Sequence, residues 1–413
     1  MKIGYACIPL TIHNKTTRSF TLKNYNNDKL IDCTKSNLQD LYKILEYNAS
    51  KGILMFRISS DIIPFGSHEI NNFNWSEYFK EDFKKISNLI KNNSIRVSMH
   101  PGQYTVLNSN SESTVKKSIK DLEYHALFLD SISNDLSNKI ILHVGGVYND
   151  KKEAIKRFIN VYNSLSSNVK DRLVIENDER NYCIDDLLNI NEYIRIPIIY
   201  DNLHYYCYEG NSTNNIKILS AIKDTWKSKD GTIKVHYSQQ SLNKRLGSHS
   251  NTILIEEFLK YYNSLEGFNV DIMAEVKDKD FSAIKMVNSI KELTNDTASI
   301  NKDSILNSYK FFLMERGSDL FTISSSILNE KGIIEFYKFV DKYSNIHINE
   351  SLSLKSIKEF YLTFEDKLCK NEISHYNKIF KNNDILKFKD YTLKIAERKS
   401  LDTILSNYFL YKY

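Results

Sequence analysis

Six short, mostly apolar segments in this chain each end on a residue that can bind a metal ion. The clearest covers residues 96–99, which lead into His100 and are broken at once by Pro101 and Gly102. A short apolar run that stops at a turn signal predicts a buried strand. The same pattern recurs at five other ligand-type residues, namely His143, Glu176, Asp201, His236 and Glu275. A metal-binding barrel requires strands that each present a His, Asp or Glu at the carboxyl end.

Strands and helices are predicted to alternate strictly through the first 290 residues. The predicted strands are residues 2–6, 53–58, 96–100, 139–144, 172–176, 196–201, 232–237 and 270–275. The predicted helices are residues 37–49, 77–91, 113–132, 151–166, 184–192, 214–226, 251–264 and 280–290. Residues 11–35 are polar and are expected to form a loop, with Ser36 as the cap of the first helix.

This alternation predicts parallel strands. Eight such units have the size of a (β/α)8 TIM-type barrel. A doubly wound open sheet is the alternative, but it would not bring six strand ends to one centre as a closed barrel does. No Gly-rich dinucleotide fingerprint or P-loop follows any predicted strand, so we expect no nucleotide cofactor.

The chain is predicted to have two parts. Residues 1–290 form the barrel, and residues 291–413 form a mostly helical C-terminal region without a catalytic motif. Basic residues outnumber acidic ones between residues 367 and 399. That excess would suit a DNA backbone, although a solvated helix face is the simpler explanation.

Composition places few limits on the partner. The net charge of +5 permits an anionic partner without requiring one. The five cysteines are odd in number and lack metal-ligand spacing, which indicates a reducing cytoplasm. We find no signal peptide and no apolar run long enough to cross a membrane, so a cytoplasmic protein without a membrane partner is expected.

The candidate metal ligands combine imidazoles and carboxylates, a mixture that suits Mn²⁺, Zn²⁺ or Fe²⁺ better than Mg²⁺. Two of the ligands, His204 and His249, lie in loops beyond the strand ends. Eight ligands exceed the needs of one ion, so we expect two or three divalent ions with bridging carboxylates. Glu176 is the predicted bridging ligand because it lies on the middle strand of the set. The full set is His100, His143, Glu176, Asp201, His204, His236, His249 and Glu275.

Lys234 lies two residues before His236, so both side chains point to the same face of the strand. If that face is the barrel interior, a free ammonium group there would be costly. The lysine could be neutral, paired with a carboxylate, or covalently converted to an acid.

Closely spaced ions can deprotonate water, polarise a phosphoryl centre and stabilise a leaving alkoxide, as phosphodiester hydrolysis requires. Gln103 and Tyr104 follow a ligand-bearing strand, and an amide with an aromatic ring can wedge into a base stack. Arg57 and Lys151 could contact phosphates. Two alternatives to a phosphodiester hydrolase stay open. One is a metal-dependent sugar isomerase or epimerase on the same barrel, and the other is a non-catalytic protein that binds DNA and senses damage in it.

The sequence resembles the UV damage endonuclease family. The matching segments occur in family order over roughly residues 1–290. They are Asn48 with Arg57-Ile58-Ser59-Ser60-Asp61 and Pro64, His100-Pro101-Gly102-Gln103-Tyr104, His143-Val144-Gly145-Gly146 with Asp150-Lys151, Glu176-Asn177-Asp178, Asp201-Asn202-Leu203-His204, Lys234-Val235-His236-Tyr237-Ser238, and Asp271-Ile272-Met273-Ala274-Glu275 with Lys277.

The resemblance implies a DNA excision-repair enzyme with a barrel similar to that of the endonuclease four family. It implies an Mn²⁺-favoured cluster of up to three ions and cleavage on the 5′ side of UV dipyrimidine photoproducts, with abasic sites as a further substrate. It assigns the metal-ligand roles to the eight residues above and lesion probing to Gln103 and Tyr104. In some members the lysine that matches Lys234 is carboxylated. The expected partner is damaged double-stranded DNA, bound by a monomer associated with the nucleoid.

Overall fold

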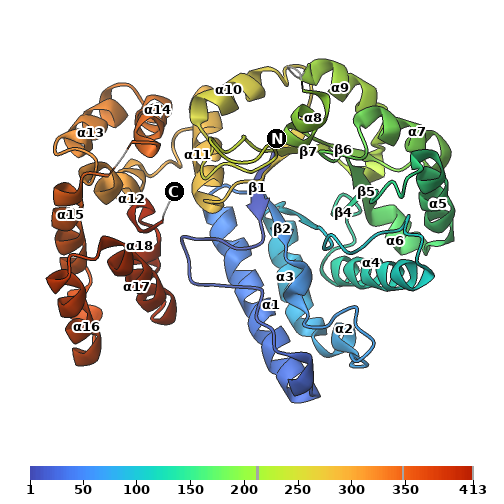
Figure 1. Ribbon diagram of the computed structural model, residues 1–413, viewed down its shortest axis with the longest axis horizontal. Helices are drawn as coiled ribbons and strands as arrows, with labels where there is room; N and C mark the ends of the chain where they lie inside the picture. The colour runs from blue at the N-terminus through green and yellow to red at the C-terminus, as the bar shows by residue number, and fades with distance from the viewer. Residues whose placement is uncertain (211–213, 347, 412–413) are drawn as a thin grey trace. The chain divides into compact units, whose positions relative to one another are not determined.

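The computed structural model describes residues 1–210, 214–346 and 348–411. Eight parallel strands close into a barrel in sequence order, with β8 hydrogen-bonded to β1 (Figure 1). The predicted (β/α)8 barrel is therefore confirmed. The strands are β1 (Ile3–Ala6), β2 (Met55–Ile58), β3 (Arg96–Met99), β4 (Lys139–His143), β5 (Leu173–Glu176), β6 (Ile198–Asp201), β7 (Ile233–Tyr237) and β8 (Val270–Ala274).

Helices connect successive strands, as the right-handed crossover of a parallel sheet requires. They are α1 (Asn27–Ser50), α2 (Trp75–Tyr78), α3 (Lys80–Asn92), α4 (Glu112–Ile132), α5 (Lys151–Ser164), α6 (Ser167–Arg172), α7 (Ile184–Ile194), α8 (Asn202–Glu209), α9 (Asn215–Ile222), α10 (Ile255–Asn263) and α11 (Asp280–Leu293). Each of the eight predicted helices has a counterpart here, although two of them are broken into shorter pieces.

The predicted loop at residues 11–35 is wrong over its last third. Helix α1 begins at Asn27, and Asn26 caps it by accepting a hydrogen bond from the Lys29 amide at 2.9 Å. The buried face of this extension includes Leu30 and Thr34, and Asn37 follows on the same face. Polar residues at positions 34 and 37 therefore interrupt the apolar spacing that would have predicted the start of the helix. Asn37 is tolerated there because its amide donates to two backbone carbonyl groups at 3.0 Å.

Contacts group the described residues into two compact units. The first contains residues 1–8, 14–250 and 261–277, and thus all eight strands. The second contains residues 9–13, 251–260 and 278–413, so that α11 is grouped with the C-terminal helices. Those helices are α12 (Lys302–Met314), α13 (Leu320–Glu330), α14 (Ile333–Ser344), α15 (Glu350–Leu362), α16 (Lys370–Lys381), α17 (Ile385–Arg398) and α18 (Asp402–Leu405). The division at residue 290 stays a prediction. No helix in the described ranges is long and apolar enough to cross a membrane.

One column of side chains in the barrel interior is polar from its base to its top. Along β3, Arg96 donates to Asp271 of β8 at 3.0 Å, and Ser98 accepts a hydrogen bond from Lys234 of β7 at 2.6 Å. Strands β7 and β8 are not neighbours of β3, so these contacts cross the interior. Side chains two residues apart on a strand share a face, and His100 is the next position in this column. The fold thus carries a column of inward polar groups up to the carboxyl ends of the strands.

At the base of the barrel, Lys139 makes a buried ion pair whose loss should be costly. Its ammonium group donates to the Asp230 carboxylate at 2.5 Å and to the Asp171 carbonyl at 2.7 Å, and its side chain is fully buried. Lys139→Met would leave Asp230 buried without its cation. We expect the free energy of unfolding to fall by about 3 kcal/mol, measured by urea denaturation.

The matched control for this prediction is Lys156→Met. Lys156 pairs with Glu153 on the surface, where both side chains are more than half exposed. That substitution should leave the free energy of unfolding close to the wild-type value. Equal losses in the two variants would contradict the assignment of Lys139 as a buried, paired cation.

Candidate metal centre

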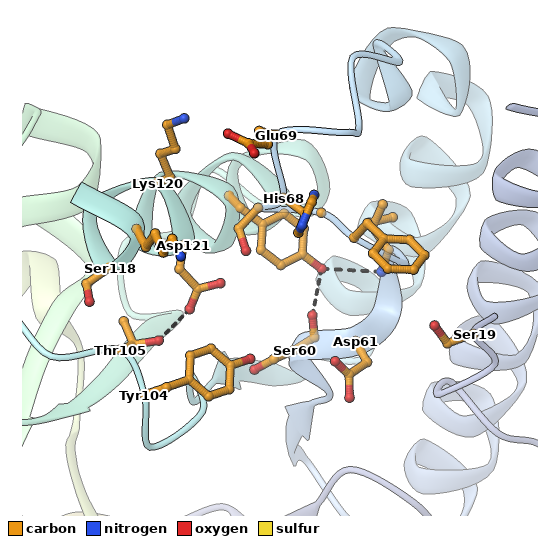
Figure 2. Close-up of a pocket in the computed structure, with 16 residues that line it drawn as sticks. Ser19, Ser60, Asp61, His68, Glu69, Tyr104, Thr105, Ser118, Lys120 and Asp121 are labelled. Carbon is orange, nitrogen blue, oxygen red and sulfur yellow. Dashed lines mark hydrogen bonds between the residues drawn. The ribbon is translucent and has the colours of Figure 1, made fainter. Parts of the chain in front are cut away.

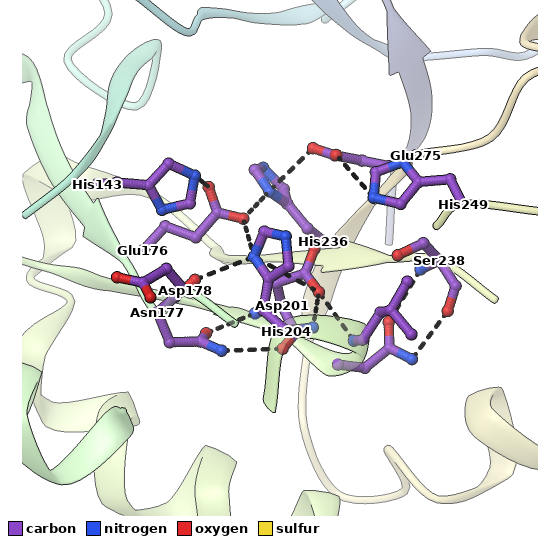
Figure 3. A network of polar contacts seen from close by, with 12 residues as sticks. His143, Glu176, Asn177, Asp178, Asp201, His204, His236, Ser238, His249 and Glu275 are labelled. Carbon is purple, nitrogen blue, oxygen red and sulfur yellow. Dashed lines mark hydrogen bonds and ion pairs between the residues drawn. The ribbon is translucent and has the colours of Figure 1, made fainter. Parts of the chain in front are cut away.

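The carboxyl ends of the strands converge on the buried carboxylate of Glu176, the last residue of β5 (Figure 3). Its Oε1 lies 2.6 Å from Nδ1 of His236 and 3.8 Å from Nδ1 of His204. Its Oε2 lies 3.3 Å from Nε2 of His100 and 3.7 Å from Nε2 of His143. Four imidazoles from four different strand ends therefore surround one carboxylate.

Ligand atoms fall into two groups that share Glu176. One group is His100, His143 and Glu176, and the other is Glu176, Asp201, His236 and Glu275. Within each group the ligand atoms lie within 4.8 Å of one another, a spacing that a single ion can span. A carboxylate common to two groups is what the predicted bridging role requires, and the assignment of that role stays a prediction.

Asp201 has one carboxylate oxygen committed and one available. Its Oδ1 caps α8 by accepting from the amides of Leu203 and His204, each at 2.8 Å. Its Oδ2 is buried and has no hydrogen-bond partner among the described residues. A buried carboxylate oxygen without a donor is costly, and a bound cation would remove that cost. The donor set of this centre therefore fits divalent metal ions.

Helix α8 also places His204, and the sequence reasoning did not predict this helix. His204 lies one turn into α8, where its Nδ1 donates to the carbonyl of Asn177 at 3.1 Å. That bond fixes the ring, as outer hydrogen bonds commonly do for metal-binding histidines. The amide of Asn177 also bonds the backbone of Asp201, donating at 3.1 Å and accepting at 2.9 Å. Sequence reasoning assigned Asn177 no such role, although it directly follows Glu176.

Burial and neighbouring charges prepare several of these groups for metal binding. Burial lowers the pKa of His100, and it lowers the pKa of His236 to about 4. Both rings are therefore neutral at pH 7, which is the form that binds metals. Burial opposes ionisation of Glu275, but the nearby Arg57 guanidinium and His236 hold its pKa below the usual value.

The pKa values of Asp201 and His204 are both raised, but by different causes. Burial raises the pKa of Asp201 to about 7. Burial acts in the opposite direction on His204, but the carboxylates of Asp201 and Glu176 raise the pKa of that ring to about 9. A divalent ion bound beside these groups would favour the ionised carboxylate and the neutral imidazole.

Lys234 is buried in the barrel interior below these ligands, as the spacing with His236 predicted. Its ammonium nitrogen lies 2.6 Å from the Ser98 hydroxyl. Burial, followed by the positive charges of Arg57 and Arg96, lowers the pKa of Lys234 well below its ordinary value. Loss of the ammonium proton is therefore easier here than on an exposed lysine.

The remaining predicted residues lie at different distances from the centre. His249 lies at its edge, with Nε2 3.9 Å from Glu275 Oε2. The Arg57 guanidinium is buried, pairs with the Glu275 carboxylate and lies 3.2 Å from Nε2 of His236. Lys151 instead pairs with Asp186 of α7 at 2.8 Å. Gln103 and Tyr104 are exposed on the loop that follows His100. The DNA-contact roles of these residues stay predictions.

Comparisons with known proteins agree on one family. A family model described as UV-endonuclease UvdE matches residues 1–307. The UV DNA damage endonuclease of Clostridium perfringens (strain 13 / Type A) is 46% identical over 400 residues and covers 96% of both chains. That of Bacillus cereus (strain 03BB102) is 32% identical over 307 residues, which is 71% of this chain and 95% of its own. The solved structure of SacUVDE is 41% identical with a TM-score of 0.67, and the match covers 71% of this chain and 99% of SacUVDE.

Replacing Glu176 with glutamine should impair metal binding, because the neutral amide removes the charge shared by both ligand groups. We expect bound Mn²⁺, measured by inductively coupled plasma mass spectrometry after dialysis, to fall by at least one ion per chain. Glu179→Gln, three residues away and partly exposed, is the matched control and should keep the wild-type content. Full metal content in Glu176→Gln would contradict the shared-ligand assignment.

Proposed function

This chain belongs to the UV-endonuclease UvdE family, and we propose that it cuts damaged double-stranded DNA on the 5′ side of UV dipyrimidine photoproducts. Membership of the family makes it a DNA endonuclease. The observation that carries the finer proposal is the carboxylate of Glu176, which two groups of potential metal ligands share at the open end of the barrel. Abasic sites are proposed as a second class of substrate.

We propose that two or three divalent ions, with Mn²⁺ favoured, are held by the imidazoles and carboxylates at the strand ends. When bound, such ions would activate the attacking water and stabilise the charge that develops on phosphate and leaving oxygens. The mixture of nitrogen and oxygen ligands favours Mn²⁺ over Mg²⁺. The proposed ligands are His100, His143, Glu176, Asp201, His204, His236, His249 and Glu275.

The chain's own residues would position the DNA around this centre. Gln103 and Tyr104 are proposed to probe the lesion, because they lie on the loop next to His100 and Tyr104 is 69% exposed. An aromatic ring beside a polar amide can replace unstacked bases. Arg57, which pairs with Glu275, is proposed to offset the negative charge of a DNA phosphate at the centre. Lys151 is proposed to leave Asp186, with which it now pairs, and to contact the DNA backbone.

A metal-dependent sugar isomerase or epimerase is the alternative on this fold. Both functions would use ions at the carboxyl ends of barrel strands. Family membership favours DNA over a small sugar as the substrate. The paired residues Gln103 and Tyr104 also fit a stacked polymer better than a small neutral ligand.

Nicking of an end-labelled duplex that carries one cyclobutane dimer tests the proposal. We expect one cut immediately 5′ of the dimer in the presence of Mn²⁺ and none in the presence of a chelator, because hydrolysis depends on the bound ions. An undamaged duplex of the same sequence is the control substrate. Failure to cut the damaged duplex by a preparation with measured bound metal would contradict the proposed function.

The same assay examines the two loop residues. The double substitution Gln103→Ala with Tyr104→Ala should reduce cutting of the dimer at least about tenfold, because no side chain would then replace the unstacked bases. Bound Mn²⁺ should stay at the wild-type level. Loss of metal in this double variant would show that the loop belongs to the metal centre.

We propose that Lys234 carries a carboxyl group. Its neutral amine can attack carbon dioxide, forming a nitrogen–carbon bond and releasing one proton, which yields a carbamate. After incubation with ¹³C-labelled bicarbonate, wild-type protein should show one carbamate carbon signal by NMR that Lys234→Met lacks. The same signal in both proteins would contradict the assignment of the modification to Lys234.

A further inference from the structure

A buried polar stripe on α4 contacts both ends of the loop that carries Gln103 and Tyr104. We propose that this stripe, formed by Ser118, Asp121 and His125, positions the loop and thereby sets how well the enzyme unstacks and cuts a lesion in a fully paired duplex. The residues recur at intervals of three and four, which places them on one face of the helix. They are positioning residues, since they lie beneath the loop. The proposal rests on the proposed function.

The far end of the loop is held by two hydrogen bonds to the stripe. The Thr105 hydroxyl donates to the Asp121 carboxylate at 2.7 Å (Figure 2). The Val106 amide donates to the Ser118 hydroxyl at 2.8 Å. Thr105, Ser118 and Asp121 are all buried. A buried hydrogen bond to a carboxylate is among the stronger polar contacts in proteins, so this end is firmly placed.

The near end is held through Ser60. Its hydroxyl lies 2.8 Å from the carbonyl of His100 and 2.9 Å from Nε2 of His125. His125 Nδ1 lies 2.6 Å from the Asp121 carbonyl, which can only accept, so Nδ1 carries the proton. Burial lowers the pKa of His125 and keeps the ring neutral, which leaves Nε2 as an acceptor. The single Ser60 proton is therefore shared between the imidazole and the His100 carbonyl.

Tyr124, the neighbour of His125, ties the same region to the loop after β2. Its hydroxyl donates to the Ser60 carbonyl at 2.8 Å and accepts from the Ile63 amide at 3.3 Å (Figure 2). One helix thus fixes Ser60 from two sides. An apolar residue at position 125 would pack equally well without the unfavourable burial of an imidazole, so the polar contact with Ser60 is what His125 adds.

Hydrogen bonds matter here because packing cannot hold the loop on this side. A pocket of about 430 Å³ lies beside Tyr104, and its lining includes Thr105, Ser118, Asp121 and Tyr124. The Tyr104 ring folds over Gly102, where an added Cβ would lie 2.5 Å from the ring. Without its anchors the loop has space into which Gln103 and Tyr104 could shift. Displacing a wedge by about 1 Å can reduce catalysis by about 100-fold.

Matched substitutions separate loop positioning from general stability. Thr105→Val removes the hydroxyl and keeps the branched shape, whereas Thr105→Ser keeps the hydroxyl. His125→Leu removes the contact with Ser60, whereas the amide of His125→Gln can restore it. Glu123→Gln, on the exposed face of α4, is the control. Bound Mn²⁺ and melting temperature are measured for every variant.

The decisive measurement compares kcat/KM on two substrates, a dimer in a fully paired duplex and the same dimer in an unpaired bubble. A bubble is already unstacked, so it needs less help from the wedge. We expect Thr105→Val and His125→Leu to lose about tenfold more activity on the paired duplex than on the bubble, with recovery in Thr105→Ser and His125→Gln. Equal losses on both substrates, or no recovery, would overturn the proposal.

Hydrogen–deuterium exchange keeps this test independent of the proposed function. Peptides that cover residues 100–108 should exchange faster in Thr105→Val and His125→Leu than in the wild type. If the wild-type protein cuts neither substrate, the proposed function fails, and the exchange rates still report whether the stripe holds the loop. Unchanged exchange in both variants would overturn the positioning role.

Discussion

The carboxylate of Glu176 imposes the constraint on which the rest of this structure depends. It is buried where four imidazoles approach it, so its charge is not hydrated there. The closed barrel makes this arrangement possible, because parallel strands deliver all their carboxyl ends to one side. The outer contacts of Asn177 and Arg57 then fix the ligands and offset part of their charge. The scaffold and the centre are in this sense one electrostatic unit.

Function in this protein is divided between rigid and less restrained parts. Ligands lie at or just beyond strand ends, where neighbouring strands and buried hydrogen bonds leave them little freedom. Gln103 and Tyr104 lie only a few residues beyond one ligand, yet both are exposed. Helix α4 contacts both parts. Its polar stripe makes a hydrogen bond with Thr105 and, through Ser60, is linked to the backbone carbonyl of His100. A helix that covers the barrel thus also supports the loop that would meet DNA.

The sequence predicts the strands and the convergence of their end residues because both depend on a strong local signal. Runs of apolar residues that stop at His, Asp or Glu need no knowledge of distant partners. The first turns of α1 escaped prediction because the buried face that starts at Leu30 continues with the polar residues Thr34 and Asn37. The buried amide of Asn37 is satisfied only by tertiary hydrogen bonds. Helix α8 was not predicted because Asp201 was assigned only as the last residue of a strand, whereas it is also the N-cap of this helix.

Contacts between residues far apart in sequence limit how much of the candidate site can be predicted from the sequence. The contact of Arg57 with Glu275 spans more than 200 residues, and that of His125 with Ser60 spans 65. No spacing rule links such pairs, so neither contact could be predicted from the sequence. Lys234 is instructive because a two-residue interval sufficed to predict its burial beside His236. Identifying Ser98 as its contact needed the closed barrel.

The inward column of Arg96, Ser98 and His100 has a consequence for how such a chain can vary in length. Their side chains share one face only because each is two residues from the next. A single inserted or deleted residue between Arg96 and His100 would turn some of these side chains outward. The metal-ligand position of His100 and the contact of Arg96 with Asp271 could then not both be preserved. Strand lengths are therefore fixed by the chemistry they serve. Tolerated gains and losses of residues should be confined to the loops, where recognition of the substrate can diversify.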